Sequence, residues 1–347
     1  MARPNWFGFP GDELPPNVEL LQLIVGKWVA QAVYVAAELG IADLLGDGAR
    51  TSADVARACR TDDDATYRLM RALSNIGVLE ELDGRVFALT DVGQFLRAGV
   101  PGSVRGFARF VGYAPTWGPW GELLHSVRTG EPATEKVLGE GLFDYYAKHL
   151  DESAVFDEAM TSISTVEAAA VAGAFDFSGI STLADVGGGR GYLLATILGA
   201  NPSLNGILFD LPHVVAGAPP LLREQGVEAR VRLEGGSFLE TAPAGADAII
   251  MKHILHDWND DDSIRILRHC HRVLPRAGRV LVVEAVVPPP GQQGWAKLLD
   301  LEMLAITPRG RERTEGEYAE LFAKGGFRMT RVVPTMSPVS VVEGEKT

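Results

Sequence analysis

The sequence predicts an α/β protein in which a mainly helical N-terminal part precedes a domain built on a mainly parallel sheet. From residue 181 onward, short apolar runs alternate with helical stretches, which is typical of parallel strands covered by helices on both faces. Before that point, apolar residues recur at helical spacing. The chain has 347 residues, and at roughly 150 residues per domain this length predicts about two domains, each with its own core.

The first elements are helices. After the Pro15-Pro16 breaker, apolar residues recur at helical spacing from Val18 through Leu45, and the apolar faces are too wide for a single solvated helix. Within it, the longest apolar stretch, Leu20 to Leu45, is interrupted by polar residues at positions 22, 27, 31, 38 and 43. We therefore interpret it as buried or dimer-forming helices rather than as a membrane span.

A winged-helix outline follows. A helix cap at Ser52 opens a short helix, and a second helix runs from about residue 64 to residue 75 and stops at Gly77. Two short strands, Leu79–Leu82 and Arg85–Leu89, are joined by the Asp83-Gly84 turn. Between residues 101 and 177 the pattern is helical again and rich in aromatic residues.

The second half contains the strands and helices of the α/β part. The expected strands are TLADVG, GILFDL, VRLEGGSF, AIIMKHIL and RVLVVEAV, with helices between them, one of which covers residues 261–273. Thr314 and Glu317 fit a capping box that opens the next helix. The tail FRMTRVVPTMSPVSVVE predicts a terminal pair of strands.

Composition narrows the classes of function. The chain carries 45 acidic against 32 basic groups, and this balance argues against nucleic acid, whose phosphates need clustered Lys and Arg. Its two cysteines, Cys59 and Cys270, indicate ordinary thiols in a reducing compartment. The start of the chain lacks a basic region followed by an apolar one, so we expect a cytoplasmic protein. No HExxH, CxxC or D-x-D-x-D pattern occurs, so we expect no metal site.

A glycine turn follows the first strand of the α/β part. That strand ends in DVGGGRG, residues 185–191, where a ligand can approach the backbone and the N-terminus of the next helix. The spacing is G-x-G-x-G, which departs from the dinucleotide fingerprint G-x-G-x-x-G. Asp185 precedes Gly187 by two positions, and its carboxylate suits a cationic amino group better than a pyrophosphate. Tight packing of the strand on the helix would explain the glycines equally well.

Asp210 ends the second strand, where a carboxylate can accept hydrogen bonds from two ribose hydroxyls. It would also serve as a cap for the helix that begins in LPHVV. Together with the glycine turn and the GGSF segment at 235–238, Asp210 indicates a nucleoside ligand that carries positive charge.

Two histidines follow the fourth strand in KHILHDW, residues 252–258. Ligands of open α/β sheets bind beyond the carboxyl ends of the strands, so this segment faces the same crevice as the glycine turn. A neutral imidazole there can take a proton near neutral pH, because its unperturbed pKa is about 6.5. The residues alone do not distinguish His253 from His256 as the base. Glu284, which ends the fifth strand, and Glu312 could approach the imidazole and fix its tautomer.

The motifs DVGGGRG, FDLPHV, KHILHDW, VVEA and GRERT, in that order, resemble those of the S-adenosylmethionine-dependent O-methyltransferases of the plant caffeate and flavonoid type and of their bacterial relatives that act on aromatic polyketides such as carminomycin. The resemblance covers about residues 17–340. It implies a winged-helix dimerisation domain over residues 1–100, a helical linker over 101–178 that contributes to the substrate pocket, and a Rossmann-like class I methyltransferase domain with a seven-stranded sheet over 179–347. It also implies a homodimer, an aromatic small-molecule substrate in secondary metabolism, and S-adenosylhomocysteine as a product.

The resemblance assigns roles position by position. It selects His256 as the general base, flanked by Glu284 and Glu312, because His253 occupies a place that Trp often holds in the plant enzymes. The implied cofactor-binding residues are Ser164, Asp185, Gly187, Gly189, Asp210, Leu211, Ser237, Phe238 and Lys252. The implied substrate-binding residues are Phe143, Tyr146, Phe156, Met160, Asp257 and Met303.

Two departures and one competing interpretation accompany the resemblance. Ser237 stands where the family usually has an Asp that accepts the adenine amino group. Some bacterial relatives keep the cofactor but perform decarboxylation, hydroxylation or cyclisation, although the retained His256 and glutamates favour methyl transfer here. The winged-helix outline would also suit a DNA-binding regulator, but residues 50–110 hold nine Arg and eight acidic residues, which gives no phosphate-binding stripe.

Overall fold

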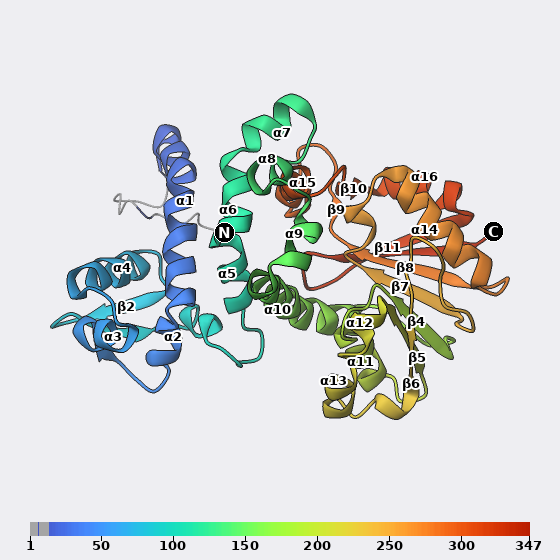
Figure 1. The fold of residues 1–347 in the computed structure, drawn as a ribbon, viewed down its shortest axis with the longest axis horizontal. Coiled ribbons are helices and arrows are strands. Elements are labelled where there is room, and N and C mark those ends of the chain that lie inside the picture. Colours follow the sequence, from blue (N-terminus) through green and yellow to red (C-terminus); the bar gives the residue numbers. More distant parts are fainter. Residues whose placement is uncertain (1–5, 7–13) are drawn as a thin grey trace. The chain divides into compact units, whose positions relative to one another are not determined.

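The computed structural model describes residue 6 and residues 14–347, which fall into two compact units (Figure 1). The first unit comprises the chain up to Trp117 together with His149–Ile163. The second unit comprises Gly118–Lys148 and Ser164–Thr347. The domain boundaries expected at residues 100 and 178 stay predictions.

The first unit is mainly helical, as the sequence predicts. Its helices are α1 (Pro16–Glu38), α2 (Ile41–Leu44), α3 (Ser52–Cys59), α4 (Asp63–Asn75), η1 (Gly93–Leu96) and α5 (Arg105–Gly112), with the start of α6 (Ala114–Gly121) and of α10 (Leu150–Ala174). Helices α1 and α5 approach closely because Gly112 has no side chain, and a Cβ at this position would overlap the side chain of Tyr34. The amide of Gln31 donates to the carbonyl of Gly112 at 3.0 Å across the same contact.

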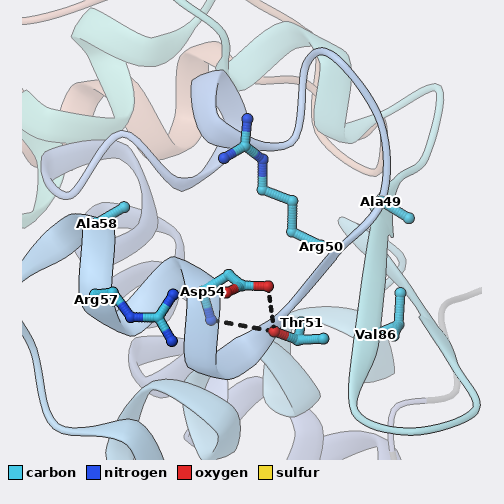
Figure 2. Close-up of a pocket in the computed structure, with 7 residues that line it drawn as sticks. All are labelled: Ala49, Arg50, Thr51, Asp54, Arg57, Ala58 and Val86. Carbon is cyan, nitrogen blue, oxygen red and sulfur yellow. Dashed lines mark hydrogen bonds and ion pairs between the residues drawn. The ribbon is translucent and has the colours of Figure 1, made fainter.

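The winged helix is present, with two corrections. Its sheet has three strands in the order β1 (Arg50–Thr51), β3 (Val86–Leu89) and β2 (Leu79–Leu82). The cap of α3 is Thr51, not Ser52, because the cap needs extended backbone and Thr51 still pairs with β3. The Thr51 hydroxyl accepts from the Asp54 N–H at 3.1 Å, and a pocket lined by both residues lies beside it (Figure 2). Strand β3 starts at Val86 rather than at Arg85, which takes a left-handed conformation (φ +59°) in the turn.

Helix α1 exposes an apolar face. Its exposed large apolar residues are Leu20, Leu21, Leu23, Ile24 and Trp28. By length and composition α1 could cross a membrane, and 17% of its most apolar window is buried within the chain. A single helix of this kind is weak evidence for a membrane span, because a core helix of a soluble protein and a signal sequence pass the same test.

The second unit contains the seven-stranded sheet, in the order β11-β12-β8-β7-β4-β5-β6 (Figure 1). Strands β4 to β8 of this sheet are parallel, and β12 is antiparallel to both β8 and β11. The strands are β4 (Thr182–Val186), β5 (Asn205–Asp210), β6 (Val231–Gly235), β7 (Ala248–Lys252), β8 (Arg279–Glu284), β11 (Phe327–Pro334) and β12 (Ser340–Lys346). The expected mainly parallel sheet and the terminal strand pair are thereby confirmed.

Helices cover both faces of this sheet, because alternate residues of each strand point into two separate cores. Ile250 of β7 belongs to the core that packs against α10 and α11, whereas Ile249 and Met251 belong to the core on the side of α14 and α16. These helices are α11 (Tyr192–Ala200), α12 (Pro212–Val215), α13 (Pro219–Glu224), α14 (Asp260–Val273) and α16 (Glu315–Gly325). Helix α16 opens with the expected capping box of Thr314 and Glu317.

A helical layer completes the second unit beside α15 (Ala296–Ile306). It consists of α7 (Leu123–Thr129), α8 (Ala133–Leu138) and α9 (Leu142–Lys148). The buried hydroxyl of Thr134 donates to the carbonyl of Ile306 at 3.2 Å, and the indole N–H of Trp120 donates to the carboxyl group of Glu302. The segment 118–148, distant in sequence, is thus fixed to the helix that follows β9 (Val286–Val287).

Candidate active site

The glycine turn after β4 is shaped for a ligand. Gly187, Gly189 and Gly191 all take left-handed conformations, with φ of +71°, +59° and +86°. A Cβ at Gly187 would overlap Ile254, whereas a Cβ at Gly189 would have nothing within 4 Å. The turn therefore needs glycine at position 187 for close packing, and it leaves open space beside the backbone at position 189.

Two carboxyl groups flank this turn. Asp185 is 1% exposed, and its Oδ2 has no hydrogen-bond partner among the described residues. Burial raises the pKa of Asp185 to about 7, with Lys252 opposing the shift and Asp210 adding to it. Asp210 accepts from the N–H of Gly189 at 2.8 Å and from the N–H of Leu211 at 2.6 Å. A buried acceptor without a donor and a second carboxylate at the strand end fit a ligand with a cationic group and hydroxyls.

The residues expected to bind the adenine end of the cofactor lie at and just after the ends of β5 and β6. Leu211 is 44% exposed although apolar. The hydroxyl of Ser237 accepts from the N–H of Leu239 at 3.3 Å. The ring of Phe238 meets that of Trp258 edge to face, with centroids 6.0 Å apart. These residues offer flat apolar surface and hydroxyl or backbone groups, but no carboxylate at position 237.

His256 lies in the short turn η3 (Leu255–Asp257) after β7 and is bound by Glu312. Its Nδ1 is 2.7 Å from Oε1 of Glu312, and its Nε2 is 3.7 Å from the nearer oxygen of Asp257. Burial lowers the pKa of His256, but the charges of Asp257, Glu312 and Glu284 together raise it to about 10. Burial in turn raises the pKa of Asp257 to about 6.

Glu284 does not make the contact with the imidazole that the sequence suggested. It is fully buried, and one of its oxygens accepts from the backbone N–H groups of Ile254, Leu255 and His256 at 2.7–3.2 Å. The other oxygen accepts from the hydroxyl of Tyr318. The reason for the difference is that η3 leaves three amides without helical partners, and a carboxylate at the end of the adjacent strand satisfies them. Glu284 acts on His256 through the backbone and through its charge.

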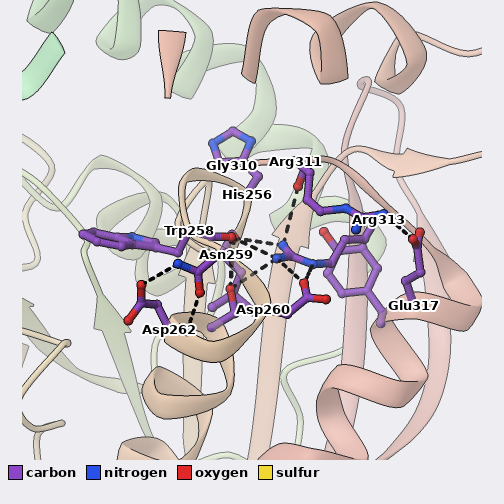
Figure 3. A network of polar contacts seen from close by, with 12 residues as sticks. His256, Trp258, Asn259, Asp260, Asp262, Gly310, Arg311, Arg313 and Glu317 are labelled. Carbon is purple, nitrogen blue, oxygen red and sulfur yellow. Dashed lines mark hydrogen bonds and ion pairs between the residues drawn. The ribbon is translucent and has the colours of Figure 1, made fainter. Parts of the chain in front are cut away.

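Sequence reasoning missed Arg313, which fixes the same turn from below (Figure 3). Its guanidinium is 1% exposed and donates to the carbonyls of Leu255 and Trp258, each at 2.9 Å, and to Asp260 at 2.8 Å. The neighbouring N–H of Arg311 donates to the carbonyl of His256 at 2.8 Å. The GRERT segment therefore holds both the imidazole and the backbone of the turn. Its signal in the sequence was an arginine directly before the Thr314 cap.

Glu167 of α10 is a second missed residue. Its oxygens lie 2.9 and 3.0 Å from Nε2 of His253, and one of them lies 3.1 Å from Nζ of Lys252. The ring of His253 stacks on that of His256, with centroids 4.9 Å apart. The available signal was that Glu167 is the sole charged residue between Met160 and Ala174.

The expected substrate-binding residues divide between the units. In the second unit, Tyr146 and Met303 are 4% and 5% exposed, and Phe143 is 51% exposed. Phe156 and Met160 belong to the first unit, where Phe156 meets Phe110 at 5.8 Å. Ser164 lies on α10 in the second unit, one turn before Glu167. Among the residues that the structure describes, no group of three or more His, Cys, Asp or Glu could hold a metal ion.

Comparison with known proteins identifies the family. Residues 120–328 match the model of the O-methyltransferase domain, and residues 21–99 match the O-methyltransferase dimerisation domain. The phenazine O-methyltransferase PhzM of Lysobacter antibioticus is 42% identical over 95% of this chain and 96% of its own length.

Solved structures agree. The crystal structure of LaPhzM superposes with a TM-score of 0.91 and 41% identity, covering 96% of this chain and all of that one. An O-methyltransferase from neocarzinostatin biosynthesis, solved with S-adenosylmethionine and 2-hydroxy-5-methyl naphthoic acid, gives a TM-score of 0.77 and 32% identity, covering 92% of this chain and 96% of that one. The two family models and these relatives match nearly the whole chain, and the structure has the glycine turn with its unpartnered aspartate. The protein therefore belongs to the family of S-adenosylmethionine-dependent small-molecule O-methyltransferases that carry an N-terminal dimerisation domain.

Proposed function

We propose that this protein transfers the methyl group of S-adenosylmethionine to a phenolic hydroxyl of an aromatic small molecule in bacterial secondary metabolism, without a metal, and with His256 as the general base. The observation that carries the proposal is the 2.7 Å contact of His256 Nδ1 with Glu312. Glu312 binds Nδ1, so Nε2 is the ring nitrogen that can receive a proton from the substrate.

The cofactor is assigned to the crevice at the carboxyl ends of β4, β5 and β7. Asp185 would bind its amino group, and Asp210 would accept from the ribose hydroxyls beside the open face of Gly189. The remaining residues assigned to the cofactor are Ser164, Gly187, Leu211, Ser237, Phe238 and Lys252. When bound, the cofactor supplies a sulfonium methyl group as the electrophile.

The charges around His256 make its neutral form a base strong enough to take the proton of a phenol, and this form grows tenfold per pH unit up to the pKa of the imidazole. A phenol such as that of Tyr has a pKa of about 10, and the carboxylates beside His256 raise its pKa to about 10. Proton transfer between groups of matched pKa is close to thermoneutral. Asp257 and Glu312 stabilise the imidazolium that results, and Glu284 and Arg313 hold the backbone that carries it.

We assign the aromatic substrate to Asp257, which lies beside His256, and to Tyr146, Phe143 and Met303 of the same unit. A related enzyme has been solved with a hydroxylated naphthoic acid and S-adenosylmethionine, which supports an aromatic substrate. Phe156 and Met160, in the first unit, stay predictions.

We further propose that the protein is a cytoplasmic homodimer that binds neither a membrane nor nucleic acid. The dimerisation domain begins at residue 21, and the exposed apolar residues of α1 lie within or beside it. A partner chain would bury this face, which offers an alternative to burial in lipid. A monomer in solution scattering of the intact protein would contradict this part of the proposal.

The experiment that tests the function is mass spectrometry after incubation with S-adenosylmethionine, a chelator and a panel of phenolic polyketides and hydroxybenzoates. We expect a gain of one methyl group on a substrate and an equal amount of S-adenosylhomocysteine. His256→Ala should lose most of the turnover while the cofactor still binds. Activity that needs an added metal, or unchanged turnover of His256→Ala, would contradict the proposal. Cofactor-dependent conversion without a methylated product would indicate decarboxylation, hydroxylation or cyclisation instead.

A further inference from the structure

His253 is strained and has no part in the chemistry proposed so far. It follows β7 directly in a left-handed conformation with φ of +54°, which costs free energy in a residue other than glycine. Its ring lies against the ring of His256, with the two planes at 28°. Strain of this kind persists where surrounding contacts impose it, and it concentrates at functional sites.

The contacts of His253 determine which of its nitrogens carries the proton. Nε2 lies 2.9 and 3.0 Å from the oxygens of Glu167. Although burial opposes ionisation, His253 and Lys252 lower the pKa of Glu167 to about 2, so Glu167 is a carboxylate that can only accept. Burial lowers the pKa of His253, which keeps the ring neutral. The single proton is therefore on Nε2, and Nδ1 presents a lone pair.

This lone pair has nothing to bind. Nδ1 of His253 is buried and has no hydrogen-bond partner among the residues that the structure describes. The nearby cation, Lys252, is bound to Glu167 at 3.1 Å. A buried acceptor without a donor costs free energy, and most such atoms in folded proteins are satisfied.

We propose that Nδ1 of His253 binds the aromatic substrate, by accepting a hydrogen bond from an O–H or N–H group that neighbours the hydroxyl to be methylated. The inference rests on the proposed function, because it places the substrate against His256. Nδ1 can only accept, so its partner must be a donor. Because the rings of His253 and His256 are stacked, the two substrate groups lie close together on one ring system. The site therefore selects catechol-like or 2-aminophenol-like substrates over substrates with a single hydroxyl.

Binding of two probes tests this selectivity without turnover. Calorimetry would compare 2,3-dihydroxynaphthalene with 2-naphthol on the protein saturated with S-adenosylhomocysteine. One neutral hydrogen bond is worth about fivefold in affinity, so we expect the ratio of the two affinities to be about fivefold higher in the wild type than in His253→Phe. This variant keeps a flat ring against His256 but lacks Nδ1.

Glu167→Gln is a second variant that leaves His253 in place. The glutamine amide can donate to Nε2, which moves the ring proton to Nδ1 and turns this atom into a donor. We expect Glu167→Gln to lose the preference for the diol and to gain affinity for 3-methoxy-2-naphthol, whose methoxy oxygen accepts. Circular dichroism and the affinity for S-adenosylhomocysteine would be measured for both variants.

Three results would overturn the inference. One is an equal diol preference in the wild type and in both variants, and another is the absence of binding of either naphthol to the wild type. The third is a loss of S-adenosylhomocysteine affinity in His253→Phe with the diol preference kept, which would assign Nδ1 to the cofactor. Discrimination between the probes without any methylated product would instead contradict methyl transfer in the proposed function and leave standing only the hydrogen bond from the ligand to Nδ1 of His253.

Discussion

Replacing Glu312 with Gln should move the pH dependence of catalysis toward lower pH. The amide keeps the size of the side chain and an oxygen that can accept from Nδ1 of His256, now at 2.7 Å from Glu312. What the change removes is one of the three negative charges that raise the pKa of His256 to about 10, the others being Asp257 and Glu284.

The magnitude follows from the contact distance. An opposite charge at this range shifts a pKa by about 1–3 units, so the pKa of His256 in Glu312→Gln should fall to between about 7 and 9. His256 must be neutral to accept a proton. The rate therefore rises with pH, tenfold per unit, until the pH reaches the pKa of His256. In the wild type the rise should continue toward pH 10, and in the variant it should level off 1–3 units earlier.

The assay is kcat/KM for a methylated phenol, followed by S-adenosylhomocysteine release from pH 6 to pH 10. Asp262→Asn offers a matched control, because the carboxylate of Asp262 accepts from the side-chain amide of Asn259 and pairs with Arg265, and it makes no contact with His256. The control should keep the wild-type profile. An inflection that is unchanged in Glu312→Gln, with activity retained, would refute the assignment of the rising limb to His256.

Three further changes test other parts of the site. Asp185→Asn should stabilise the cofactor-free protein above pH 7 and should bind the cofactor more weakly. The pKa of Asp185 is raised to about 7, so its ionisation opposes folding by up to about 4 kcal/mol once the pH exceeds that value. Equal stability of the variant and the wild type at pH 8 in urea denaturation would contradict the expected stabilisation. Arg313→Met should cost at least about 2 kcal/mol in the same measurement, because it leaves the carbonyls of Leu255 and Trp258 without their donor, at about 1–3 kcal/mol each. A loss below about 1 kcal/mol would show that the network is dispensable. Thr314→Ala should cost about 1 kcal/mol through loss of the capping box of α16, whereas Thr314→Ser should restore most of it.

The strands and the motifs at their ends could be predicted because their signals are local. The apolar runs, the glycines at 187–191 and the Thr314–Glu317 spacing each depend on neighbouring residues, and each feature appears in the structure where it was expected. The cap of α3 shifted by one residue because Thr51 is held by pairing with β3, a contact between residues 35 positions apart.

The partners of the buried carboxylates could not be predicted in the same way. Glu284 was expected to meet the imidazole, but the amides of η3 compete for it, and their orientation is set by the backbone rather than by residue type. Glu167 is 86 positions from His253, and only the packing of α10 on the sheet brings them together. The separation of Glu167 from these residues in sequence explains why the family resemblance did not reveal the cluster of Lys252, Glu167 and His253.

Glu284 binds the backbone of the η3 turn rather than the imidazole, and this has a consequence for how the protein can evolve. Its carboxylate holds the amides of residues 254–256 and the hydroxyl of Tyr318, and it makes no contact with the side chain at position 256. The turn is therefore anchored whether or not a histidine occupies it. A lineage could lose the proposed base and keep the backbone of this turn, which leaves position 256 open to different chemistry once the buried Glu312 changes with it. For directed evolution, position 256 should be varied together with position 312, because Glu312 is buried and loses its partner with the imidazole, whereas a library at position 284 should consist mostly of unfolded proteins.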